Sequence, residues 1–82
     1  MGKNVRAHGI ITGRVQGVWY RMETKQAADL NGVVGWVRNK RDGSVEAVFE
    51  GSEDAVKSTL AWCWKGPPAA RVDHIDVTWE PY

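Results

Sequence analysis

The chain has 82 residues, of which 11 are Lys or Arg and 10 are Asp or Glu, so its formal net charge is +1. This length suits one domain, and the balanced charge excludes a general nucleic-acid or membrane-surface binder, because such binders need a basic excess. Cys63 is the one cysteine, which excludes an intrachain disulfide and a cysteine-rich zinc site and is typical of the reducing cytoplasm.

The first half of the chain reads as strand, helix and strand. Residues 5–15 alternate between small apolar and mostly polar side chains, which predicts a half-buried strand. Residues 20–31 have helical spacing, and Asn31-Gly32 is a suitable end because both residues tolerate the left-handed conformation. Residues 33–39 alternate again and predict a second strand. The faces expected to point inward hold Tyr20, Ala27 and Leu30 on the helix, and Val33, Gly35 and Val37 on the second strand.

The second half reads as strand, helix and strand. Asp42-Gly43 is a strong hairpin signal that leads into a third strand over residues 44–50. Ser52 is a good N-cap for a helix that runs to Lys65 and ends in a Gly-Pro-Pro run. Residues 71–79 predict the last strand. The inward faces of these three elements are expected to hold Val45, Ala47 and Phe49, then Val56, Leu60 and Cys63, then Ile75, Val77 and Trp79.

This βαββαβ order predicts the α+β class and a ferredoxin-like sandwich: a four-stranded antiparallel sheet of order 4-1-3-2 with two helices on one face. In this topology the first two strands run in the same direction, with the third strand between them. The end of the first strand, the start of the first helix and the end of the second strand then share one edge of the sheet. The two strands are about 10 Å apart there, which side chains can span.

The segment from Gly13 to Arg21 joins the first strand to the first helix. Its loop amides and the free N–H groups of the helix start can form an anion-binding concavity, and Gly17 lets the backbone bend closely around a ligand. Arg21 stands in the first helical turn, where its guanidinium can grip two phosphate oxygens. A plain turn with a solvated arginine fits these residues equally well, because strand–glycine–helix junctions are common.

Asn39 ends the second strand, at the same predicted edge as the loop and Arg21. Its amide can hold a water molecule by donating or accepting a hydrogen bond. It has no useful pKa, so it is not a general base. Taken alone, Asn39 indicates only a turn cap, which is the commonest role of asparagine at such positions.

Two motifs carry a resemblance to a known family. Gly13-Arg14-Val15-Gln16-Gly17-Val18-Trp19-Tyr20-Arg21 is similar to the first acylphosphatase signature. Residues 35–39 with residues 42–46 are similar to the second, and the second helix and last strand also resemble those of the family. The resemblance covers nearly the whole chain and implies one acylphosphatase-like domain over residues 1–82.

The resemblance implies hydrolysis of an acyl phosphate to a carboxylate and orthophosphate, without a metal or other cofactor. Arg21 is then expected to bind the phosphate and stabilise the transition state, and Asn39 to orient the attacking water. Trp19 departs from the family, where a smaller residue is common. Its backbone amide is kept for phosphate binding, and the acyl-group preference stays open. The amides expected to hold the phosphate are those of Gln16, Gly17, Val18, Trp19, Tyr20 and Arg21.

Several other functions share the predicted fold. An RNA-recognition module would need aromatic residues on the outer face of the two central strands, where this chain has none. A metal-carrying domain would need paired cysteines in its first loop. Acylphosphatase-like domains also occur inside larger carbamoyl-transferring maturation proteins, so a carbamoyl phosphate preference stays open, as does ligand binding without turnover.

The remaining expectations concern location and side-chain environment. No apolar run follows the charges of residues 1–8, and no apolar stretch approaches the roughly 20 residues that cross a bilayer, so a cytoplasmic protein is expected. The start at Met1 and the end after the last strand favour a free-standing enzyme. A monomer is expected. His8 and His74 are expected at the surface, Cys63 in the core, and most of the five tryptophans in the core or a pocket wall.

Overall fold

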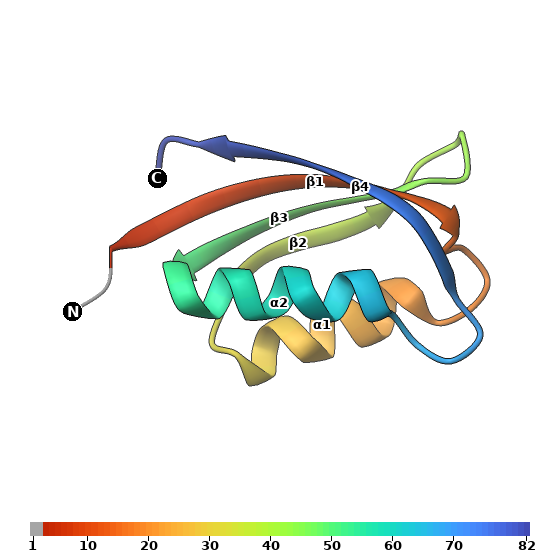
Figure 1. Cartoon of the computed structure of the whole chain (residues 1–82), viewed down its shortest axis with the longest axis horizontal. Helices are drawn as coiled ribbons and strands as arrows, with labels where there is room; N and C mark the ends of the chain where they lie inside the picture. The colour runs from red at the N-terminus through yellow and green to blue at the C-terminus, as the bar shows by residue number, and fades with distance from the viewer. Residues whose placement is uncertain (1–2) are drawn as a thin grey trace.

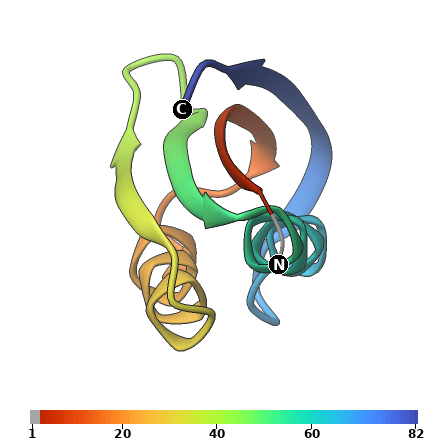
Figure 2. The same ribbon diagram turned by 90° about the vertical axis from the view of Figure 1, so that its left-hand side faces the viewer.

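The computed structural model describes residues 3–82, and the first two residues of the expected domain lie outside the described part. The three strand pairings follow the predicted sheet order, read from the opposite edge as β2-β3-β1-β4. Both helices cover one face of this curved sheet (Figures 1 and 2). The elements are β1 (Asn4–Arg14), α1 (Tyr20–Leu30), β2 (Val34–Asn39), β3 (Val45–Ser52), α2 (Glu53–Lys65) and β4 (Arg71–Glu80).

The register of the sheet sets where β1 and β2 end. Each of the two strands is antiparallel to β3, which lies between them, so they run in the same direction. Val45 of β3 pairs with Ile11 of β1 on one side and with Asn39 of β2 on the other. The loop after β1 and the turn after β2 therefore emerge at the same edge of the sheet, as the topology predicts (Figure 1).

The buried core lies between the sheet and the helices, and most predicted inward residues of the strands belong to it. On α1, Leu30 does not belong to the core, because this residue is 89% exposed. A helical repeat of 3.6 residues places Tyr20, Thr24, Ala27 and Ala28 on one stripe of α1, and these are the residues that the helix buries. The stripe has turned away from Leu30, so the prediction of an inward Leu30 is wrong.

The end of β4 also differs from the prediction. Ile75 is buried beside its strand partner Ile11, whereas Val77 and Trp79 are 36% and 49% exposed. β4 is an edge strand, and Trp79 pairs with Ala7, so its side chain lies on the helix side of the sheet but beyond the cover that the helices provide. Trp62 alone among the five tryptophans is partly buried and packed on the core, while Trp19, Trp36, Trp64 and Trp79 are exposed.

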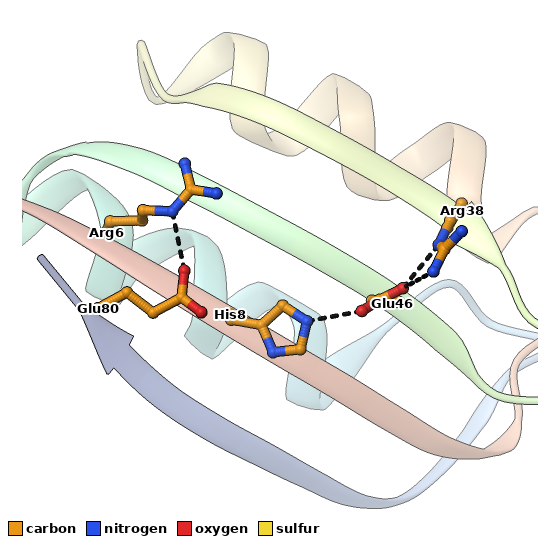
Figure 3. A network of polar contacts seen from close by, with 5 residues as sticks. All are labelled: Arg6, His8, Arg38, Glu46 and Glu80. Atoms are coloured by element: carbon orange, nitrogen blue, oxygen red, sulfur yellow. Dashed lines mark hydrogen bonds and ion pairs between the residues drawn. The ribbon is translucent and has the colours of Figure 1, made fainter. Parts of the chain in front are cut away.

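Ion pairs cover the outer face of the sheet (Figure 3). Arg6 lies 2.9 Å from Glu50 and 2.8 Å from Glu80, and Glu46 is contacted by His8 at 2.7 Å and by Arg38 at 2.6 Å. Hydrogen bonds from His8 and Arg38 hold the pKa of Glu46 below its ordinary value. His8 is therefore a paired residue, and this face of β1 and β3 carries charges where an RNA-stacking platform would carry aromatic rings.

The thiol of Cys63 is buried, as predicted, and the Tyr20 hydroxyl donates a 2.7 Å hydrogen bond to its backbone carbonyl. Burial raises the pKa of this thiol to about 11. Only the thiolate reacts, and near neutral pH the thiolate fraction of Cys63 is about a hundredfold smaller than that of an ordinary cysteine.

We expect a disulfide reagent to label Cys63 in the native protein at least a hundredfold more slowly than in the same protein in concentrated urea. Equal labelling rates in the two states would contradict the buried placement.

None of the described helices is long and apolar enough to cross a membrane.

Candidate active site

The loop between β1 and α1 is held by three side chains that point into the core. Val15, Val18 and Tyr20 are 1%, 4% and 1% exposed. Between them, Gly17 and Trp19 adopt left-handed backbone conformations, with φ angles of 73° and 67°. Left-handed residues within a turn can direct successive N–H groups toward a common centre, and such a concavity is called an anion-binding nest. The side chains thus anchor the loop while its backbone stays available.

The backbone N–H groups of this loop have no partner in the part of the chain that the structure describes. Among residues 3–82, no hydrogen bond is donated by the N–H groups from Gln16 to Met22, and the first such bond runs from Glu23 to the Trp19 carbonyl at 3.0 Å. Within the same residues, no side chain caps the start of α1. Unpaired amides and the positive end of a helix dipole together favour an anion at this place.

Trp19 holds a conformation that is costly for any residue with a side chain. It is the one non-glycine residue with a positive φ in the described chain. Such a conformation costs of the order of 1–3 kcal/mol and persists when the surroundings impose it, often at functional sites. Trp19 is 68% exposed, so its side chain contributes little core packing in return. The departure noted in the sequence thus falls where the backbone itself favours glycine.

A pocket of about 290 Å³ opens at this edge of the sheet. It unites Arg21, the second residue of α1, with Asn39, the last residue of β2, as the topology predicts. Gln16 and Val18, which were predicted to contribute only their backbone amides, are not among the described lining residues. The lining residues are Val15, Gly17, Trp19, Tyr20, Arg21, Met22 and Asn39.

Tyr20 contributes to this pocket through its backbone, since its side chain belongs to the core. The ring packs 6.0 Å from that of Trp62, and the hydroxyl is bonded to α2. Burial raises the pKa of Tyr20 well above its ordinary value, so the hydroxyl stays protonated. The side chain therefore fixes the start of α1 against α2 and takes no part in proton transfer.

Arg21 and Asn39 are both exposed and uncommitted. Within the described residues, neither side chain forms an ion pair or hydrogen bond with the protein. The guanidinium is therefore available to an anion in the pocket, and the amide is available to water or ligand. Asn39 is held by its backbone pairing with Val45 and does not cap the turn with its side chain.

The hairpin after Asn39 closes on itself. The Lys40 N–H donates to the Ser44 carbonyl at 2.9 Å, and the Gly43 N–H donates to the Lys40 carbonyl at 3.2 Å. Asp42 accepts from the Ser44 N–H at 2.9 Å and from its hydroxyl at 2.6 Å, and these bonds lower the pKa of Asp42. The turn residues thus form a tight unit directly beside Asn39.

Gln16 makes a contact that the sequence did not reveal. Its side-chain Nε2 donates to the Lys40 carbonyl at 2.7 Å and to the Ser44 carbonyl at 2.8 Å. Only the backbone amide of this residue was predicted to matter. A loop glutamine carries no local signal of a partner 24 or 28 residues away.

A second, larger groove of about 650 Å³ runs between α1 and β2 and shares Arg21 and Met22 with the first pocket. Lys25 and Trp36 are among its lining residues, whereas Asn39 is not. Across residues 3–82, no group of three or more His, Cys, Asp or Glu side chains is placed to hold a metal ion.

One family model and several known proteins are similar to this chain over most of its length. The family model described as Acylphosphatase matches residues 7–82. An acylphosphatase of Pelotomaculum thermopropionicum is 51% identical over 77 residues, which cover 94% of this chain and 84% of the relative. The crystal structure of acylphosphatase from Bacillus subtilis superimposes with a TM-score of 0.92 at 37% identity, covering 95% of this chain and 87% of that one. The structure of T. kodakarensis HypF matches at a TM-score of 0.81 and 33% identity, covering 94% of this chain and 10% of that one.

Proposed function

The chain belongs to the acylphosphatase family and hydrolyses acyl phosphates, and we propose that Arg21 and Asn39 carry this reaction in the 290 Å³ pocket beside the β1–α1 loop. The observation that supports the assignment best is their meeting beside a loop whose amides, from Gln16 to Met22, lack any acceptor among the described residues. An anion-binding nest, a free guanidinium and a free amide are the groups that such a reaction requires.

The loop and Arg21 bind the phosphate of the substrate. The amides from Gln16 to Arg21 converge on its oxygens, and the exposed guanidinium of Arg21 adds two charge-assisted hydrogen bonds. During phosphoryl transfer, charge spreads over the equatorial phosphate oxygens. Donors fixed in place before the reaction stabilise that charge without reorganising, which is the largest single contribution in many enzymes.

Asn39 places the attacking water opposite the leaving group. The water oxygen forms a bond to phosphorus while the bond from phosphorus to the acyl oxygen breaks, and the carboxylate leaves with that electron pair. The proton of the water passes to a phosphate oxygen of the substrate. A carboxylate leaves without needing a proton, so positioning and electrostatics carry the reaction and neither a strong acid nor a metal is required.

The remaining proposals concern the whole chain. We propose that residues 1–82 act as one acylphosphatase-like domain, as a monomer in the cytoplasm, without a cofactor, a metal or a nucleic-acid partner. The balanced charge and the ion-paired outer face of the sheet support the last point. The exposed Trp19 beside the loop supports an acyl-group preference that differs from relatives with a small residue there.

Replacement of Asn39 tests the assignment of the water-positioning role. We expect Asn39→Ala to lower kcat for benzoyl phosphate by about a hundredfold, because a water displaced by even 1 Å is poorly aligned. Inhibition by inorganic phosphate should stay near the wild-type level, because the loop and Arg21 remain. The measurement is steady-state hydrolysis with a chelator present, on benzoyl phosphate and on carbamoyl phosphate. Wild-type turnover by Asn39→Ala, or a requirement for added metal, would contradict the proposal.

A further inference from the structure

The side chain of Gln16 joins the two halves of the pocket. Its Nε2 donates to the carbonyls of Lys40 and Ser44, at 2.7 Å and 2.8 Å. These residues flank the last rung of the β2–β3 ladder, in which Asn39 pairs with Val45. One amide group therefore binds both ends of the hairpin turn, directly beside Asn39. Because both partners are carbonyl oxygens, the nitrogen and not the oxygen of the amide must face them.

Each half of the pocket keeps its own shape without this contact. The loop is anchored by Val15 and Val18 in the core. In the hairpin, the Lys40 and Ser44 carbonyls each accept a second hydrogen bond, from the N–H groups of Gly43 and Lys40. Loss of the Gln16 amide thus leaves the turn closed and neither carbonyl without a donor.

The β1–β3 ladder and the core that Val15, Val18 and Val45 share set the two halves roughly in place, and the Gln16 amide is the direct hydrogen-bonded link between them. Within residues 3–82, no other hydrogen bond or ion pair joins residues 15–22 to residues 39–45. β2 is an edge strand, and its hairpin extends beyond the sheet (Figure 1). A hydrogen bond buried from competition with water holds such a geometry better than an exposed one, and Gln16 is partly buried.

We propose that the Gln16 side chain is a positioning residue that sets the distance between the phosphate loop and Asn39. The loop and Arg21 bind the phosphate, whereas Asn39 arrives on a different element, so the alignment of water with phosphorus depends on the tie between them. Misalignment by about 1 Å can lower a rate by about a hundredfold. This proposal rests on the proposed roles of Arg21 and Asn39.

Gln16→Met tests the proposal, since methionine has a similar length but no donor. We expect kcat for benzoyl phosphate to fall by about tenfold or more, while the inhibition constant of inorganic phosphate changes by less than about threefold. The matched control is Gln26→Met, the same change at an exposed position of α1, which should keep both wild-type values. Urea unfolding of each variant checks folding, and Gln16→Asn, which keeps the amide but is one methylene shorter, serves where Gln16→Met does not fold.

The double variant Gln16→Met with Asn39→Ala separates positioning from general damage. If Gln16 acts through Asn39, its replacement in the Asn39→Ala background should lower kcat by less than about twofold. Wild-type kcat in Gln16→Met, a parallel loss of phosphate binding, or a full additional loss in the double variant would each overturn the proposal. Failure of the proposed function would instead show as unimpaired turnover in Asn39→Ala alone.

Discussion

Arg21→Ala should lower kcat/KM for benzoyl phosphate by about a thousandfold or more, because a phosphate-binding arginine that stabilises transition-state charge is worth that much in comparable reactions. The guanidinium makes no ion pair or hydrogen bond with residues 3–82, so its loss should leave the free energy of unfolding almost unchanged. Binding of inorganic phosphate should weaken in parallel, unlike in Asn39→Ala. Steady-state kinetics and phosphate inhibition measure both effects.

Two further variants show whether the loss of activity in Arg21→Ala comes from the geometry of the guanidinium or from its charge. Arg21→Lys keeps the charge but loses the planar fork, so we expect activity between that of the wild type and Arg21→Ala. Arg41→Ala removes an exposed positive charge from the hairpin at the same edge and should change kcat/KM by no more than a few-fold, an effect that salt screens. If Arg21→Ala kept activity within tenfold of the wild type, the proposed role of Arg21 would be wrong.

Gly35→Ala should destabilise the fold by about 2–5 kcal/mol, the sum of a strained backbone and an overpacked contact. Gly35 has a φ of 146°, and a Cβ built on it would lie 1.8 Å from the Val48 carbonyl oxygen on β3. The obstacle is backbone, so a rotamer change cannot relieve it, and β2 must move away from β3. Because a domain of this size has a total stability of about 5–15 kcal/mol, the expected loss is a large part of it.

Urea unfolding measures this loss as a lower midpoint at an unchanged slope. Gly9→Ala is the matched control: its Cβ would meet other atoms only at 3.8 Å or more, so we expect stability close to that of the wild type. Gly43→Ala separates the two causes, since its φ is 95° but its Cβ would meet no atom within 4 Å. Gly35→Ala within about 0.5 kcal/mol of the wild type would be incompatible with this contact.

Local pattern was sufficient for the elements and their order. Alternation, helical spacing, the Asp42-Gly43 turn and the Ser52 cap each depend on neighbours in the chain, and the structure confirms all of these elements with ends shifted by a residue or two. The βαββαβ order restricts the topology strongly, so it also brought Arg21 and Asn39 to one edge. Their shared pocket was therefore predictable, although their chemical roles stay predictions.

The tertiary structure decided which side chains are buried wherever local sequence patterns do not specify this. The rotation of α1 on the sheet buried Thr24 and Ala28 and exposed Leu30, and the limited reach of the helices left Trp79 uncovered at the edge strand. Neither is encoded in a local period, because both depend on which surface the helix meets. The contact of Gly35 with Val48 likewise exists only once β2 and β3 are paired.

The segment from Gly13 to Arg21 shows the same division within nine residues. The sequence by itself determined a strand–glycine–helix junction with an arginine in the first helical turn, because these features are local. Only the tertiary structure decided that the Trp19 backbone is left-handed, that the amides from Gln16 to Met22 have no acceptor among the described residues, and that the Gln16 side chain binds the hairpin. The reason is physical: a hydrogen bond between distant segments forms only after the fold has placed its donor and acceptor together.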